Sequence, residues 1–99
     1  MYTPWGEPDS QTTLAEGIVD FTTPSHGGIR LSEERRKQLP EGCVNFNGGT
    51  YWWEEDCDWV VPFIVFKDDI EAGGKVPDFI ASLSQAYRLA REYHPEILR

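Results

Sequence analysis

The stretch that decides the fold is GIVDFTTPSHGGIRL, residues 17–31. Residues 17–23 are rich in β-branched and aromatic side chains that alternate between two faces, a pattern typical of a β-strand. Pro24 ends this run, and the turn that follows contains two glycines, either of which can adopt a positive φ. Residues 29–31 then predict a second, short strand. The stretch therefore predicts an antiparallel hairpin.

The chain before the hairpin predicts an irregular N-terminal arm over residues 1–16. Pro4, Gly6 and Pro8 interrupt it, and a polar stretch follows them. Trp5 is the one large anchor in the arm, so order there depends on this side chain. We expect Trp5 to pack into the core beside the hairpin.

Helix and strand signals follow the hairpin. Ser32 is a good N-cap for a two-turn helix over residues 33–39, and residues 50–53 are strongly strand-like after a glycine- and asparagine-rich loop. Residues 54–66 are ambiguous, because their first acids favour a helix whereas their later residues have strand propensity. We favour a helix that is broken or kinked at Pro62.

The C-terminal third predicts a loop and then a long helix. Residues 67–74 are polar and end in two glycines, so we interpret them as a loop. Pro77 suits the first position of a helix, and an apolar stripe continues beyond it. We expect a helix from Pro77 to about Tyr93, ended by Pro95.

Composition and length fit one small α+β domain spanning residues 1–99. Hydrophobic residues make up 39% of the chain and charged residues 26%, so the chain can bury a core and fold. The elements above predict a small, mainly antiparallel sheet of about three strands covered by two to three helices. Cys43 and Cys57 are expected to be free thiols, because a reducing cytosol disfavours a disulfide.

The net charge narrows the classes of function. Seventeen acidic residues against nine Lys and Arg give a formal charge of −8. A chain this acidic lacks the basic surface that supplies nucleic-acid affinity, so we expect no direct nucleic-acid binding. No apolar run approaches the roughly 20 residues of a membrane span, and the N-terminus lacks the features of a signal peptide. We therefore expect a cytoplasmic protein without membrane contact.

Most of the negative charge comes from residues 41–71, which hold eight acids and one Lys. If these acids share one surface, they form a face that attracts a basic partner. The alternative is an acidic domain whose charges serve solubility only. Aromatic residues flank the acids, and one or two of them are candidates for exposed interface anchors. The residues expected to contact a partner are Glu54, Glu55, Asp56, Asp58, Asp68, Asp69, Trp52 and Trp53.

Signals for catalysis and for bound metal are weak. His26, Gly27 and Gly28 predict either a structural turn or an anion-binding site built from an imidazole and backbone amides. A hydrolase would need a cysteine near His26 and a third orienting group, which the sequence does not indicate. The cysteines and histidines are widely spaced, and the acidic run lacks the pattern of a calcium loop. We expect no catalytic residue, no metal and no cofactor.

Several short motifs together resemble a known family. In chain order they are TPWG (residues 3–6), GIV (17–19), TPSHGG (23–28), LP (39–40) and EEDCDW (54–59). In this succession the chain is similar to a small, uncharacterised domain family found in phages, plasmids and other mobile elements of proteobacteria. The resemblance covers about residues 3–66. It implies a mobile-element accessory protein, without an established activity or catalytic residue.

These observations lead to the hypothesis of a phage or mobile-element accessory protein that acts by stoichiometric protein binding. The expected partner is a host or phage protein with a basic surface, and the expected role is inhibition of a host defence system such as CRISPR or restriction machinery. One alternative is a small enzyme that uses His26 with a cysteine or carboxylate. The other is a regulatory or structural module that forms oligomers.

Overall fold

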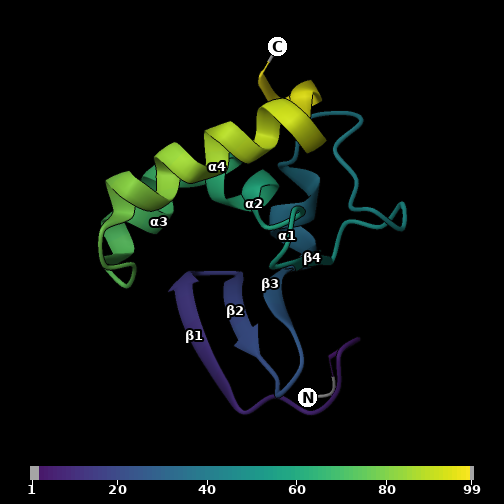
Figure 1. Cartoon of the computed structure of the whole chain (residues 1–99), viewed down its shortest axis with the longest axis vertical. Coiled ribbons are helices and arrows are strands. Elements are labelled where there is room, and N and C mark those ends of the chain that lie inside the picture. Colours follow the sequence, from purple (N-terminus) through teal and green to yellow (C-terminus); the bar gives the residue numbers. More distant parts are fainter. Residues whose placement is uncertain (1–2, 99) are drawn as a thin grey trace.

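The computed structural model describes residues 3–98 and shows an α+β domain (Figure 1). The predicted fold class is confirmed, with a four-stranded antiparallel sheet and a long C-terminal helix. In chain order the elements are β1 (Ser10–Ala15), β2 (Ile18–Thr22), β3 (Gly27–Leu31), α1 (Glu33–Lys37), β4 (Trp52–Glu54), α2 (Val60–Val65), α3 (Lys67–Gly73), α4 (Phe79–Tyr93) and the 3₁₀ turn η1 (Pro95–Leu98). Within residues 3–98, no helix combines the length and the apolar character needed to cross a membrane.

The predicted hairpin forms the centre of the sheet, whose strand order is β1-β2-β3-β4. Strands β2 and β3 pair antiparallel, with Ile18 opposite Leu31 at one end and Thr22 opposite Gly27 at the other. The β1–β2 turn therefore lies at the first end of the sheet and the β2–β3 turn at the second. We call the second end the hairpin end.

The two glycines of the hairpin are needed for close packing and not for turn geometry. Gly27 and Gly28 belong to β3, and neither has a positive φ. A Cβ at Gly28 would collide with the carbonyl oxygen of Trp53, and a Cβ at Gly27 would lie 2.7 Å from the carbonyl oxygen of Phe21. Neighbouring strands leave no room for a side chain here.

The prediction of an irregular arm over residues 1–16 is wrong in its second half. Residues 10–15 form β1, which pairs antiparallel with β2. Most of its side chains are exposed, with Leu14 as its buried residue. An edge strand of this kind gains its stability from pairing with its neighbour, so its sequence carries little apolar signal.

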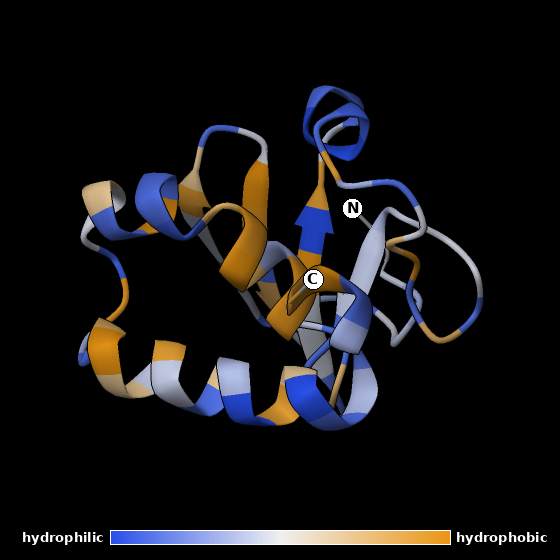
Figure 2. Cartoon of the chain, turned by 90° about the horizontal axis from the view of Figure 1, so that it is seen from above, coloured by the Kyte–Doolittle hydropathy of each residue, from blue (hydrophilic) through white to orange (hydrophobic). Residues whose placement is uncertain are grey.

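The apolar core lies between one face of the sheet, here called the inner face, and the helices. Paired residues share a face, which places Ile29 of the hairpin and Trp53 of β4 on the same side. Helix α2 lies between the sheet and α4, and the hydropathy colouring shows it as the most apolar helix (Figure 2). The buried core consists of Leu14, Ile18, Ile29, Leu31, Cys43, Trp53, Val60, Val61, Phe63, Ile64, Phe66, Ile70, Ala86 and Ala90.

Residues 54–66 are not one helix. Glu54 ends β4, a turn follows, and α2 begins only at Val60. Pro62 is buried in the first turn of α2, where a backbone N–H has no partner within the helix. The proline therefore neither breaks nor kinks the helix.

The predicted loop over residues 67–74 is also wrong, because residues 67–73 form α3. This helix has a single buried residue, Ile70, and is capped by Gly74, whose φ of 64° is left-handed. The long helix α4 ends at Tyr93 as predicted, but it begins at Phe79 after Asp78, so Pro77 lies before the helix. The first helix, α1, is shorter than predicted and ends at Lys37.

Trp5 anchors the N-terminal segment on the outer face of the sheet, opposite the core. Its ring packs edge-on against Trp52, with ring centroids 5.6 Å apart, and Trp52 packs against Phe21 at the same centroid distance of 5.6 Å. Thr3 closes the turn around Trp5, because its hydroxyl donates to the carbonyl of Gly6 at 2.6 Å. The expected docking beside the hairpin is therefore present, but outside the main core.

Candidate functional site at the hairpin end of the sheet

Two segments that are distant in sequence meet at the hairpin end. The β3–β4 register places Glu54 opposite Gly28, and the backbone N–H of Glu55 donates to the carbonyl of Gly27 at 2.9 Å. The β2–β3 turn is closed by Thr23, whose hydroxyl donates to the carbonyl of His26 at 2.7 Å and accepts from its N–H at 3.0 Å. These backbone contacts hold the histidine beside the acidic run.

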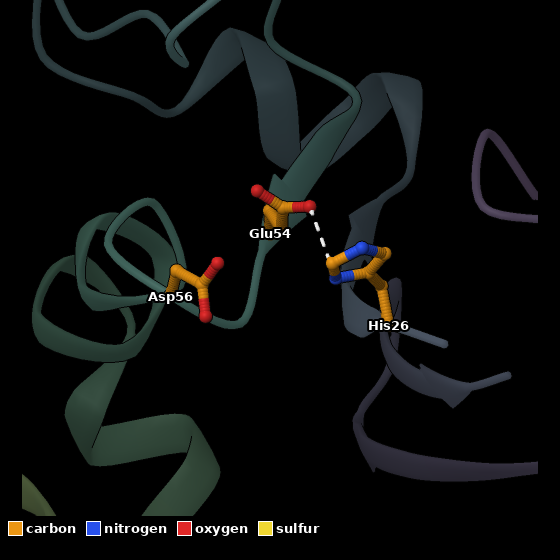
Figure 3. Close-up of side chains that lie close together, drawn as sticks. All are labelled: His26, Glu54 and Asp56. Carbon is orange, nitrogen blue, oxygen red and sulfur yellow. Dashed lines mark ion pairs between the residues drawn. The ribbon is translucent and has the colours of Figure 1, made fainter. Parts of the chain in front are cut away.

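His26, Glu54 and Asp56 form a compact cluster of side chains (Figure 3). One ligand atom from each lies within 4.8 Å of the others. The His26 Nδ1 atom is 3.7 Å from Glu54 Oε2 and 3.9 Å from Glu55 Oε1. Within residues 3–98, no Lys or Arg forms an ion pair with these three carboxylates. The surroundings of His26, Gly27 and Gly28 therefore favour a cation over the anion considered from the sequence.

The six acids expected to contact a partner do not share one face. Asp69 forms an ion pair of 2.7 Å with Arg35, whose Nε donates to the carbonyl of Glu16 in the β1–β2 turn. Asp69 and its exposed neighbour Asp68 in α3 thus lie at the end of the sheet opposite the hairpin end. The acidic surface at the hairpin end therefore contains Glu54, Glu55 and Asp56, but not Asp68 or Asp69.

Asp58 is not on the acidic surface, which corrects its expected place among the partner contacts. Its side chain is buried, with 6% exposed, and its Oδ1 is 2.8 Å from His94 Nε2. Its Oδ2 accepts from the N–H of Phe46 at 3.0 Å, and the other ring nitrogen of His94 is 2.9 Å from Glu96. This buried network ties the C-terminal segment to the 43–50 loop, a structural role that the sequence did not suggest for His94.

Trp53 is likewise no interface anchor, because it is fully buried in the core. Its indole N–H donates to the carbonyl of Thr50 at 3.0 Å, which satisfies its one polar atom. Trp52 alternates to the outer face, where it stays half-buried beside Trp5. Only one of the two adjacent tryptophans is therefore available at the surface.

A groove of about 330 Å³ opens on the outer face next to the cluster. We call it the outer groove, and its walls include Trp5, Asn45, Phe46, Trp52, Glu54 and Asp56. Phe46 is 82% exposed, which is unusual for a large aromatic residue. Sequence analysis missed this residue, because the loop around it was read only as a turn.

The loop that carries Phe46 is tightly bonded. The side-chain oxygen of Asn45, Oδ1, accepts hydrogen bonds from the backbone N–H groups of Asn47 and Gly49, both at 2.9 Å. Its side-chain nitrogen, Nδ2, donates to the backbone carbonyl of Trp52 at 2.7 Å. Backbone bonds between Asn45 and Gly48, at 2.9 Å, and between Asn45 and Gly49, at 2.8 Å, close the turn. The exposed ring is thus presented by an ordered segment.

A second hollow of about 400 Å³ lies on the inner side of the same end. We call it the inner cleft, and it is bounded by Asp20, Ile29, Glu55, Trp59, Phe63 and Lys75. Burial, with a smaller contribution from the charge of Glu55, raises the pKa of Asp20 to about 6. The sequence contained one sign of this cleft, because Asp20 places a carboxyl group on the face of β2 that packs toward the core.

The two cysteines are free thiols in the structure. Burial, and then the charge of Glu96, raises the pKa of Cys43 above its ordinary value. Burial, and then the charges of Asp58, Glu54 and Asp56, does the same for the pKa of Cys57. The raised pKa values favour the neutral thiol over the reactive thiolate at both positions.

Comparison with known proteins gives one match. Residues 1–98 match the family described as Domain of unknown function (DUF7007). No curated protein and no solved structure matches the chain. The expectation of an uncharacterised domain family is thereby confirmed.

Proposed function

We propose that this chain, which belongs to the DUF7007 family, acts by stoichiometric binding of a basic protein segment in the outer groove. The observation that carries the proposal is Phe46, an aromatic side chain that is 82% exposed beside half-buried indoles and carboxylates. Exposed aromatic residues with polar neighbours are characteristic of protein interfaces. The ordered loop supports this reading, because a rigid anchor loses little conformational entropy on binding.

The chemistry of the groove favours a basic occupant. Glu54 and Asp56 form one wall, and no Lys or Arg within residues 3–98 pairs with them. Trp5 offers a ring on which the aliphatic stem and the charged head of a Lys or Arg can lie. Trp52 lines the groove beside it and already has the guanidinium of Arg30 over its ring, 5.8 Å from the centroid. The formal charge of −8 adds long-range attraction for such a partner.

A binding role also fits the state of the cysteines. An enzyme that used His26 with a cysteine would need a thiolate, and the raised pKa of both thiols disfavours that form. A protein that works by occupying a partner needs no such group. The side chains of this region therefore suit binding better than nucleophilic catalysis by a cysteine.

We place the partner among host proteins met by a mobile element, in line with the resemblance described for the sequence. Complexes that hold nucleic acid, such as CRISPR or restriction machinery, have the basic grooves that an acidic domain can occupy. Inhibition of such a complex is the role that we propose for the domain.

The test compares two exposed apolar residues on different faces. Phe46→Ala removes the proposed anchor, and Ile80→Ala removes a residue of α4 that is 78% exposed and far from the groove in sequence and fold. After isolation of a partner from the native host, we expect Phe46→Ala to weaken its affinity at least about tenfold, a loss typical of an interface hot spot. Ile80→Ala should leave the affinity unchanged. Equal affinities for the two variants, or an acidic partner surface, would contradict the proposal.

A further inference from the structure

We infer that His26, Glu54 and Asp56 form a binding site for a divalent transition-metal ion such as Zn²⁺. The three side chains come from the β2–β3 turn, the end of β4 and the turn after it, and they lie close together, with Glu54 facing His26 (Figure 3). Imidazole nitrogen and carboxylate oxygen are both common ligands of zinc in proteins. The site shares Glu54 and Asp56 with the wall of the outer groove but does not use Phe46, so different variants test zinc binding and partner binding.

The distances within the cluster fit shared coordination better than direct hydrogen bonding. The His26 Nδ1 atom lies 3.7 Å from Glu54 Oε2, beyond the range of about 2.7–3.2 Å for a hydrogen bond. Two ligands of a tetrahedral zinc ion, each bound at about 2.0–2.1 Å, lie about 3.4 Å apart. The ligand atoms of all three residues are within 4.8 Å of one another, and His26 and Asp56 are exposed, so their side chains have room to rotate toward a shared ion.

The backbone fixes two of the three ligands, Glu54 and His26, before any ion binds. Glu54 is held by its pairing opposite Gly28, and Thr23 holds His26 through two hydrogen bonds of 2.7 and 3.0 Å. The bond of 2.9 Å from the Glu55 N–H to the Gly27 carbonyl joins the two segments. A metal ion would therefore order only side chains, which lowers the entropic cost of binding.

The local charge also favours a cation. Three consecutive carboxylates, Glu54, Glu55 and Asp56, lie at this point without a Lys or Arg ion pair among residues 3–98. Glu55 Oε1 is 3.9 Å from the same imidazole nitrogen and offers a fourth oxygen close by. A divalent ion relieves the repulsion among these groups, and the exposure of the imidazole, 48% for the side chain, leaves room for water to complete the coordination.

The imidazole decides the class of ion. Ca²⁺ and Mg²⁺ prefer sites made of oxygen atoms alone, whereas transition metals gain from a nitrogen ligand. We therefore expect Zn²⁺ to bind in the presence of a large excess of Mg²⁺ or Ca²⁺. Among divalent ions of the first row, Mn²⁺ should bind more weakly than Zn²⁺.

Calorimetric titration of the tag-free full chain with ZnCl₂ tests the site. We expect one ion per chain, and His26→Ala or Asp56→Asn should weaken binding at least about tenfold, since loss of a supporting residue alone typically costs that much. Asp68→Asn is the matched control, because it removes one exposed carboxylate from the opposite end of the sheet. Cys57→Ser tests whether the neighbouring thiol is the true ligand, and we expect it to leave the affinity unchanged.

The two histidines of the chain provide a second readout. In nuclear magnetic resonance spectra, diamagnetic Zn²⁺ should shift the imidazole signals of His26 and leave those of the buried His94, which is bonded to Asp58, in place. The inference is overturned by absence of zinc binding, by equal losses in His26→Ala and Asp68→Asn, or by loss in Cys57→Ser as large as that in His26→Ala. Displacement of zinc by Ca²⁺ or Mg²⁺ would overturn it as well. If zinc binds as expected while Phe46→Ala leaves partner affinity intact, the site stands and the proposed function fails.

Discussion

Replacing Asp20 with Asn should stabilise the folded protein at neutral pH. The carboxyl group sits in the inner cleft, where burial and the charge of Glu55 disfavour its ionised form. Within residues 3–98, no cation lies within ion-pair distance of Asp20 to offset this cost. Asn keeps the size and shape of the side chain but carries no charge, so the variant isolates the electrostatic penalty.

The size of the effect follows from the pKa. A pKa raised from 3.8 to about 6 corresponds to about 3 kcal/mol of unfavourable free energy for the ionised form. Because the side chain is partly exposed, solvent screening reduces the gain that we expect to about 1–2 kcal/mol.

The sign of the pH dependence is fixed by the direction of the shift. The native state holds its Asp20 proton up to about pH 6, whereas the unfolded state loses it near 3.8. Stability of the native protein therefore falls as the pH rises between these two values, and the penalty is complete above pH 6. The gain from Asn should be full at neutral pH and should vanish as the pH falls toward 3.8.

Urea denaturation followed by tryptophan fluorescence, at a series of pH values, measures this gain. A benefit from Asp20→Asn of the same size at acid and neutral pH would refute the electrostatic reasoning. A loss of stability at neutral pH would show that the carboxylate makes a favourable contact in the cleft.

Three further substitutions test the packing by the same denaturation assay. His94→Ala should lower the free energy of unfolding by about 3 kcal/mol, because it removes the imidazole from the buried carboxylate of Asp58 and leaves only the N–H of Phe46 to bond it. A loss below about 1 kcal/mol would argue against the network. Trp5→Ala should cost about 2 kcal/mol, less than for a fully buried tryptophan, because the ring is only half-buried against Trp52. An unchanged melting temperature would mean that the N-terminal segment is not anchored. Gly28→Ala should cost at least about 2 kcal/mol, since its Cβ meets neighbouring backbone, and a neutral result would contradict the close approach of β3 and β4.

The sequence predicted the elements whose residues carry their own signal. The hairpin was found because β2 is rich in β-branched and aromatic residues and a proline- and glycine-containing turn follows it. The end of α4 was found because Pro95 follows its apolar stripe. Strand β1 was missed since its polar residues depend on pairing with β2. Helix α3 was missed since Ile70 is its single buried residue and gives no periodicity.

The candidate site was predicted in its parts but not in its arrangement. His26 and the acids after Trp53 were both singled out, yet only the pairing of β3 with β4 brings them together. Asp58 and Trp53 were placed at the surface because a sequence shows charge and size, whereas burial depends on the tertiary fold. Alternation along β4 shows that Trp52 and Trp53 point to opposite faces, but not which face is covered.

Crosslinking from position 46 tests the proposed binding function most directly. A photoreactive phenylalanine analogue replaces Phe46 in one preparation and Ile80 in another, and each is irradiated with a lysate of the native host. The account predicts that position 46 crosslinks to one protein segment rich in Lys and Arg, that added salt reduces the yield, and that position 80 gives no such product. Crosslinks of the same identity and yield from both positions, or none from position 46, would contradict it.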